Sequence, residues 1–164
     1  MNSSQYNQFL KNQDKLFRFS LSLAGNQSDA EDIFQETLIK IWELKEEWGM
    51  WQNFEAYTMR MLRNTFLNFK KKSNNRVFVD ISEMIETPQQ NDIDELITIT
   101  DLRVKFDALI NKLPEIQRNI LHLREIEELE YKEISEILGI SESQVKVYLF
   151  RGRQYIKNKL HGTR

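Results

Sequence analysis

Residues 131–160 constrain the fold more than any other part of the sequence, because they have the pattern of two helices joined by a very short turn. Gly139 stands where a helix that ends in the left-handed conformation needs a glycine. Ser141 and Gln144 follow at the spacing of a capping box, which predicts the start of the next helix. The connection is therefore only Gly139, Ile140 and Ser141, and so short a turn predicts a helix-turn-helix.

The second of these helices has two distinct faces. Its predicted inner face carries Val145, Leu149, Gly152 and Ile156 at helical spacing. Phe150 lies on the opposite face among basic residues, where it would expose apolar area to water without gain. In a major groove the same ring can pack on a thymine methyl group, so the pattern favours DNA binding. An ordinary helical hairpin, in which Phe150 packs on a neighbouring element, is the competing interpretation.

Charge is segregated along the chain, although the formal net charge of −2 taken alone argues against a polyanionic partner. All charged residues from 58 to 76 are basic, and all those from 77 to 102 are acidic. The chain from residue 141 onwards is basic again, with Glu142 as the exception. Two basic blocks on either side of an acidic stretch predict two nucleic-acid-facing modules on a connector that DNA repels. The alternative is that these charges are simply solvated faces.

The N-terminal part has the pattern of three helices. The first is expected from about residue 4 into the low twenties, the second starts at a Ser28–Glu31 capping box, and the third starts near Asn53. Ile39 lies on the outward face of the second helix, and an exposed isoleucine indicates a partner surface. The loop EEWGMWQN between the second and third helices contains Trp48 and Trp51, which either pack into the bundle or stack on a base. The predicted core faces of the second and third helices are Ala30, Ile33, Phe34, Thr37, Leu38, Ile41 and Trp42, and Phe54, Tyr57, Met61, Leu62, Thr65, Phe66 and Phe69.

These patterns predict an all-α fold with two small helical domains joined by a flexible acidic linker. We place the first domain at residues 1–73, the linker at 74–95 and the second domain at 96–164. The few glycines (five) and prolines (two) agree with helices, and the absence of cysteine excludes disulfides, thiolate metal sites and a cysteine nucleophile. No apolar run approaches the roughly 20 residues of a membrane span, and the polar N-terminus lacks the features of a signal peptide. We therefore expect no membrane insertion and a cytoplasmic location.

Three segments together resemble the extracytoplasmic-function (ECF) sigma factors of bacterial RNA polymerase. DAEDIFQETLIKIWE at 29–43, FEAYTMRMLRNTFLNFKKK at 54–72 and residues 113–160 are similar to regions 2.2, 2.3 to 2.4 and 4 of that family, in the family's order and spacing. The resemblance covers most of the chain outside the predicted linker. It implies a sigma factor that binds core RNA polymerase and directs promoter-specific transcription initiation by recognising the minus-ten and minus-thirty-five elements. It also implies a DNA-binding protein that is not an enzyme and needs no cofactor.

The resemblance implies partners for both domains. Region 2 would bind the coiled coil of the polymerase beta-prime subunit and melted promoter DNA, whereas region 4 would bind the beta flap and double-stranded DNA. An anti-sigma factor is a further implied partner. The implied beta-prime surface is Asp32, Gln35, Glu36, Ile39 and Lys40. The implied minus-ten contacts are Arg60, Asn64 and Asn68, together with Trp48 in a loop that captures a flipped-out base.

For the upstream element, the residues that match the family's DNA-lining positions are Arg124, Lys146, Val147, Phe150 and Arg151. Val147 departs from the family pattern, since many relatives have a small polar residue there. We expect an apolar contact to replace one hydrogen bond at this position, which changes the preferred upstream sequence rather than the class of protein.

Two other classes compete with a sigma factor. A helix-turn-helix transcription regulator that never enters polymerase would account for the second domain but leaves the first unexplained. A structural or adaptor helical protein predicts neither DNA binding nor association with polymerase. Enzyme hypotheses are weak, because the two histidines, His122 and His161, lie in no metal-ligand motif and the sequence has no phosphate-binding glycine loop. We therefore predict no catalytic residue and no metal site.

Overall fold

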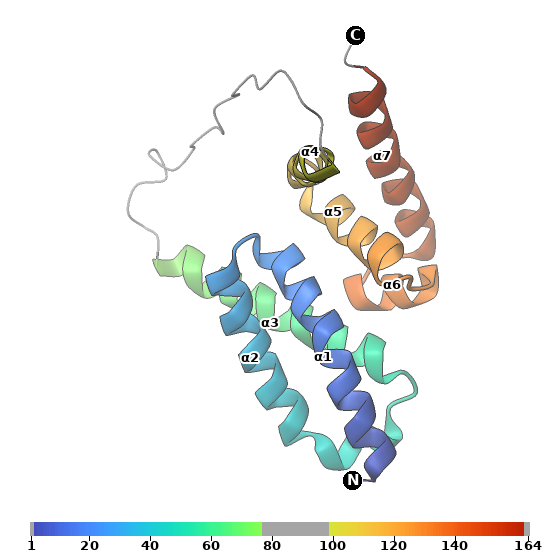
Figure 1. The fold of residues 1–164 in the computed structure, drawn as a ribbon. Coiled ribbons are helices and arrows are strands. Elements are labelled where there is room, and N and C mark those ends of the chain that lie inside the picture. The colour runs from blue at the N-terminus through green and yellow to red at the C-terminus, as the bar shows by residue number, and fades with distance from the viewer. Residues whose placement is uncertain (1, 77–98, 163–164) are drawn as a thin grey trace.

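The computed structural model describes residues 2–76 and 99–162, and every element in these ranges is helical (Figure 1). The all-α fold class predicted from the sequence is thus confirmed. We call the helices before the gap the N-terminal unit and those after it the C-terminal unit. The N-terminal unit contains α1 (Ser3–Ala24), α2 (Gln27–Glu43), the 3-10 helix η1 (Lys45–Met50) and α3 (Phe54–Arg76). The C-terminal unit contains α4 (Ile99–Asn111), α5 (Glu115–Leu121), the π-helical turn η2 (His122–Ile126), α6 (Tyr131–Leu138) and α7 (Glu142–His161).

Helices α1 and α2 are joined by only two residues, each suited to its position. Gly25 ends α1 in the left-handed conformation, with φ of 76°. Asn26 then caps α2, because its side-chain oxygen accepts a hydrogen bond from the backbone N–H of Asp29 at 2.9 Å. The predicted capping box at Ser28 is therefore wrong: the N-cap is Asn26, two residues earlier, and α2 begins at Gln27.

The predicted core faces of α2 and α3 are buried or half-buried, with two exceptions. Ile33, Thr37 and Ile41 of α2 are fully buried, as the helical spacing predicted. Trp42 and Tyr57 were expected in the core, but 39% and 40% of their surfaces are exposed. Both stand at the edge of an apolar stripe, where a large ring covers core atoms with one side and meets solvent with the other.

The helix-turn-helix is confirmed in detail. Gly139 has φ of 66°, and Ser141 and Gln144 form the predicted capping box at the start of α7. All four residues predicted on the inner face of α7 are buried. Gly152 allows a close crossing of α5 and α7, because a Cβ atom at this position would lie 3.1 Å from Cδ1 of Leu121.

The two units contact each other. Helix α5 packs on α1, and α6 packs on α3 (Figure 1). Within the C-terminal unit, α4 packs on α7. Helix α3 continues to Arg76 and α4 begins at Ile99, so residues 77–95 of the predicted linker lie outside the described residues. The domain boundaries at 73 and 96 stay a prediction.

Candidate nucleic-acid interface

The outward face of α7 presents an apolar strip flanked by cations. Phe150 is 63% exposed and Val147 47% exposed, so the predicted outward orientation of both is confirmed. Lys146 and Arg151 are exposed on the same helix. Each cation lies near an aromatic ring: Lys146 Nζ is 5.8 Å from the Tyr131 ring centre, and the Arg151 guanidinium is 5.9 Å from that of Tyr148. These contacts hold the positive charges close to the helix while leaving them open to an anionic partner.

Arg124 approaches this face from η2 and is held in place by the protein. Its Nη1 donates a hydrogen bond to the carbonyl oxygen of Leu129 at 2.8 Å, and its guanidinium lies 4.7 Å from the Tyr131 ring centre. Arg124 and Lys146 therefore share the Tyr131 ring, which places the two predicted contacts side by side. A further cation of α7, Arg153, forms an ion pair with Glu125.

Arg60, Asn64 and Asn68 form one exposed stripe along α3, because they are spaced by four residues. Arg60 borders a cavity of about 560 Å³ at the start of that helix. The cavity wall also contains the rings of Trp51 and Tyr57, which stack on each other with centres 4.1 Å apart. Basic, amide and aromatic groups thus lie together at this end of α3.

Trp48 does not belong to that exposed group. It is only 3% exposed, and its indole N–H donates a hydrogen bond to the carbonyl oxygen of Ile41 at 3.0 Å. Its ring stacks on Phe9, with centres 5.1 Å apart, and meets Phe54 edge-on. The structure thus places Trp48 in the core, which argues against its predicted contact with a flipped base. Trp51, three residues later, is the ring of this loop that reaches the surface cavity.

The predicted polymerase-binding residues share one surface of α2. Asp32, Gln35 and Glu36 are exposed, and Ile39 is 60% exposed between them and Lys40. Lys40 forms an i,i+4 ion pair with Glu36 at 3.0 Å. The structure therefore confirms an apolar side chain within a polar, mostly acidic surface, whereas its partner stays a prediction.

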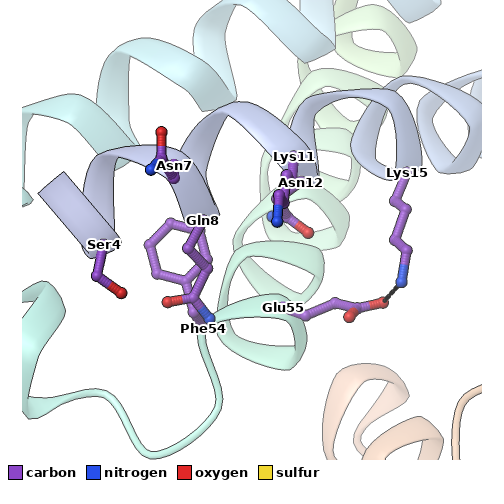
Figure 2. A pocket seen from close by; sticks show the side chains of 8 residues that line it. All are labelled: Ser4, Asn7, Gln8, Lys11, Asn12, Lys15, Phe54 and Glu55. Atoms are coloured by element: carbon purple, nitrogen blue, oxygen red, sulfur yellow. Dashed lines mark hydrogen bonds and ion pairs between the residues drawn. The ribbon is translucent and has the colours of Figure 1, made fainter.

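A second cavity, of about 730 Å³, follows the exposed side of α1 (Figure 2). Sequence reasoning did not single it out. Its walls carry amides and the cations Lys11 and Lys15, and the ion pair of Lys15 with Glu55 at 3.0 Å joins α1 to α3 at one end. The lining residues are Ser4, Asn7, Gln8, Lys11, Asn12, Lys15, Phe54 and Glu55.

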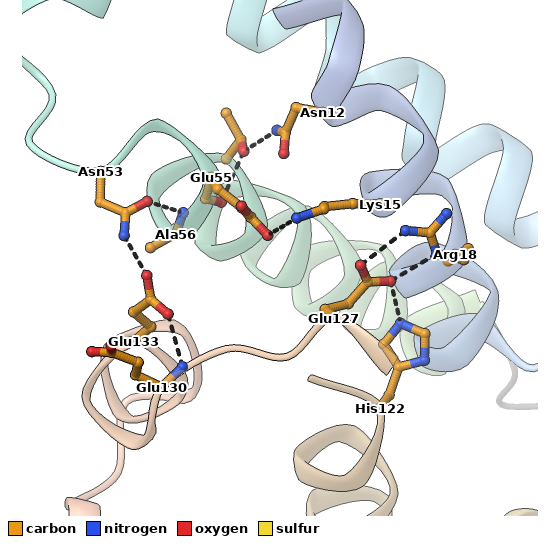
Figure 3. Close-up of polar contacts among 11 residues, drawn as sticks. Asn12, Lys15, Arg18, Asn53, Glu55, Ala56, His122, Glu127, Glu130 and Glu133 are labelled. Atoms are coloured by element: carbon orange, nitrogen blue, oxygen red, sulfur yellow. Dashed lines mark hydrogen bonds and ion pairs between the residues drawn. The ribbon is translucent and has the colours of Figure 1, made fainter. Parts of the chain in front are cut away.

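A polar cluster that sequence reasoning also missed joins the two units (Figure 3). Nε and Nη2 of Arg18 donate hydrogen bonds to the two carboxylate oxygens of Glu127, at 2.9 and 3.0 Å. Nε2 of His122 lies 3.3 Å from the same carboxylate. Burial acts to raise the pKa of Glu127, but the interactions with His122 and Arg18 outweigh it and lower that pKa to about 2. Glu127 is therefore a buried anion at neutral pH, held between α1 and η2.

Within residues 2–76 and 99–162, no group of three or more His, Cys, Asp or Glu side chains is placed to hold a metal ion. No helix in the same residues has the length and apolar character that a bilayer crossing demands.

Two protein-family models match the chain. The model described as Sigma-70 region 2 matches residues 9–76, and the model described as Sigma-70, region 4 matches residues 103–156. The first covers the N-terminal unit from Phe9 onwards and the second most of the C-terminal unit. Together they include every candidate surface described above except Ser4, Asn7 and Gln8 of α1.

Curated relatives carry the same assignment. The ECF RNA polymerase sigma factor SigM of Bacillus subtilis is 28% identical over 142 residues, which are 87% of this chain and 86% of SigM. The ECF RNA polymerase sigma factor SigE of Mycolicibacterium smegmatis is 30% identical over 149 residues, which are 90% of this chain but 58% of SigE.

Solved structures share the fold. The sigma factor RpoE of Bartonella quintana, in complex with the anti-sigma factor NepR, matches with a TM-score of 0.75 at 24% identity, over 99% of this chain and 100% of that chain. CnrH, in complex with the cytosolic domain of CnrY, matches with a TM-score of 0.65 at 16% identity, over 98% of this chain and 89% of that chain.

Proposed function

Because the chain belongs to the ECF sigma factors, which direct promoter-specific transcription initiation, we propose that one of its surfaces binds polymerase and that two others each bind one promoter element. The N-terminal unit is region 2 and the C-terminal unit is region 4. The observation that carries the proposal is the outward face of α7, where Phe150 and Val147 are exposed between cations of a helix-turn-helix. Within the described residues, no contact covers this apolar strip. Thymine methyl groups in a major groove would pack on it and explain why apolar side chains stand there.

In region 4, Phe150 and Val147 pack on base edges of the minus-thirty-five element while cations neutralise phosphates. Arg124 and Lys146, which share the Tyr131 ring, lie at one end of this contact, and Arg151 lies beyond Phe150. If about four phosphates are neutralised, the logarithm of affinity falls with the logarithm of salt concentration with a slope near −3.6. An affinity that does not change with salt would contradict this electrostatic contact.

In region 2, Arg60, Asn64 and Asn68 contact the minus-ten element along α3. Since Trp48 is buried, the rings available to an unstacked base are Trp51 and Tyr57 at the cavity beside Arg60. Stacking one base on an aromatic ring contributes roughly 1 to 3 kcal/mol, which offsets much of the cost of unstacking it. Strand opening thereby becomes selective for sequence.

The α2 surface binds the beta-prime coiled coil of core polymerase, with Ile39 as its apolar centre and Asp32, Gln35, Glu36 and Lys40 around it. Region 4 binds the beta flap. An anti-sigma factor is a further partner, a proposal supported by RpoE and CnrH, whose structures were solved in such complexes. We also propose that the protein acts in the cytoplasm, catalyses no reaction itself and needs no cofactor.

Transcription in vitro with purified core polymerase and a random promoter library tests the function as a whole. We expect initiation from a defined set of start sites that share two elements. Glu36→Lys should abolish co-elution with core polymerase without unfolding α2. Glu31→Lys is the matched control, because Glu31 is an exposed glutamate on the same helix outside the proposed surface. Failure to direct core polymerase to any start site would overturn the proposed function.

A further inference from the structure

Two cations of the C-terminal unit lie against one aromatic ring. The Arg124 guanidinium is 4.7 Å from the centre of the Tyr131 ring, and Nζ of Lys146 is 5.8 Å from the same centre. Both distances lie within the range over which the face of an aromatic ring attracts a cation. Arg124 belongs to η2 and Lys146 to α7, so the first residue of α6 brings together side chains from two other elements.

The charges of these two cations stay available to a partner. Within residues 2–76 and 99–162, neither Arg124 nor Lys146 pairs with a carboxylate, whereas Arg153 of α7 pairs with Glu125. A carboxylate neutralises the cation that it binds, but an aromatic ring attracts a cation and leaves its charge in place. The Tyr131 ring therefore holds both side chains while they keep their full positive charge.

The backbone beneath Arg124 is irregular and gives it a second support. Helix η2 is a π-helical turn, and such turns are frequent at functional sites. Glu128 follows with φ of 57°, in the left-handed region that residues with a side chain rarely adopt. The next residue, Leu129, accepts the hydrogen bond from Nη1 of Arg124 at its carbonyl oxygen. Arg124 is thus held by a backbone carbonyl and by the Tyr131 ring.

Cations that are held in advance favour binding to phosphates. A free arginine or lysine side chain has many rotamers, and fixing one such side chain in a complex weakens affinity by about two- to tenfold. A side chain that a ring already holds loses less of this freedom when a phosphate binds. Since two cations share the Tyr131 ring, we expect its removal to weaken binding by about tenfold in total.

We propose that Tyr131 is a positioning residue for recognition of the upstream element, because its ring aligns Arg124 and Lys146 for phosphates of the duplex. Tyr131 adds no charge of its own and acts through these two side chains. This inference rests on the proposed role of α7 in binding the minus-thirty-five element. The affinity for that element then depends on the order of the two cations as well as on their number.

A salt series tests the proposal with the full chain and a duplex that carries the upstream element found in the transcription experiment. Tyr131→Leu keeps an apolar side chain but removes the ring face. We expect about tenfold weaker binding and an unchanged slope of log affinity against log salt, because the number of cations stays the same. Lys146→Ala, by contrast, should reduce the magnitude of that slope by about 0.9. Tyr131→Phe should bind nearly as well as the unchanged chain, since it keeps the ring.

A double-mutant cycle separates positioning from a general structural role. In a chain that already carries Arg124→Ala and Lys146→Ala, Tyr131→Leu should cause no further loss of binding. A ring that only stabilises the fold would weaken binding by the same factor in both backgrounds. Tyr155→Leu is the matched control, because Tyr155 is also half-buried and its ring lies 5.8 Å from Nζ of Lys159, outside the proposed contact. This control should leave the affinity for the duplex unchanged.

Pentafluorophenylalanine at position 131 keeps the test valid if Tyr131→Leu unfolds region 4. It preserves the shape of the ring but reverses its quadrupole, so it should weaken binding at least as much as Tyr131→Leu. Unchanged affinity with either replacement, a smaller slope with Tyr131→Leu, or equal losses in the two backgrounds of the cycle would overturn the inference. An unchanged chain that does not bind the duplex would instead overturn the proposed minus-thirty-five contact itself, so the two failures are distinguishable.

Discussion

Replacing Trp48 with alanine should destabilise the protein far more than replacing Trp51. The Trp48 ring is 3% exposed and contacts Phe9, Trp42 and Phe54, so its removal leaves a large cavity in the core of the N-terminal unit. Removing a buried large aromatic side chain costs about 3 to 5 kcal/mol. A typical domain is stable by about 5 to 15 kcal/mol, so the variant would lose a large share of its stability.

Urea unfolding measures this loss. With a denaturant slope of about 2 kcal/mol per molar, a loss of about 4 kcal/mol lowers the midpoint by about 2 M. Trp48→Phe keeps an aromatic ring but loses the hydrogen bond to Ile41. We expect the loss of this hydrogen bond to lower the free energy of unfolding by only about 1 kcal/mol, in addition to the effect of the smaller ring. A comparison of Trp48→Ala with Trp48→Phe therefore separates the contribution of ring packing to stability from the contribution of the indole N–H.

Trp51→Ala is the matched control, because it removes the other tryptophan of the same loop. Trp51 is half-buried and stacks mainly on the exposed Tyr57, so its removal should cost about 1 kcal/mol or less of aromatic contact. Permanganate footprints should then show impaired strand opening for Trp51→Ala and nearly normal opening for Trp48→Phe. If Trp48→Ala costs less than about 1 kcal/mol, the ring is not a core residue and the argument from its burial fails.

Three further predictions concern the cluster, the recognition helix and the turn. Glu127 has its pKa lowered to about 2, so its stabilising effect is complete above its ordinary pKa near 4.5 and is lost as pH falls from there towards 2. The free energy of unfolding, measured across this range, should therefore decrease as pH falls, and Glu127→Gln should reduce this pH dependence. Phe150→Ala should weaken binding to a minus-thirty-five duplex with little change in unfolding free energy, whereas Leu149→Ala, at a buried neighbour, should cost about 2 to 5 kcal/mol in a denaturant titration. Gly139→Ala should cost about 1 to 2 kcal/mol by the same assay, because φ of 66° is strained for any residue with a Cβ while the space around it is open.

The parts of the fold that were predictable are those that local sequence encodes. Both faces of α7 followed from the spacing of its apolar residues, since a helix repeats every 3.6 residues. Gly139 and Ser141 marked the turn because a left-handed cap and a capping box each require particular side chains a few residues apart. The exposed Ile39 was visible in the same way, as an apolar side chain on the wrong face of α2.

What could not be predicted depends on contacts between distant segments or on irregular helix geometry. Trp48 lies in a six-residue 3-10 helix, where the α-helical period does not apply, so its burial was not encoded in local spacing. Arg18 and Glu127 are 109 residues apart, and each looks like an ordinary surface charge in sequence. The same holds for Asn53, whose side-chain amide donates a hydrogen bond to Glu133 at 2.6 Å. Only the packing of α6 on α3 brings these two residues together.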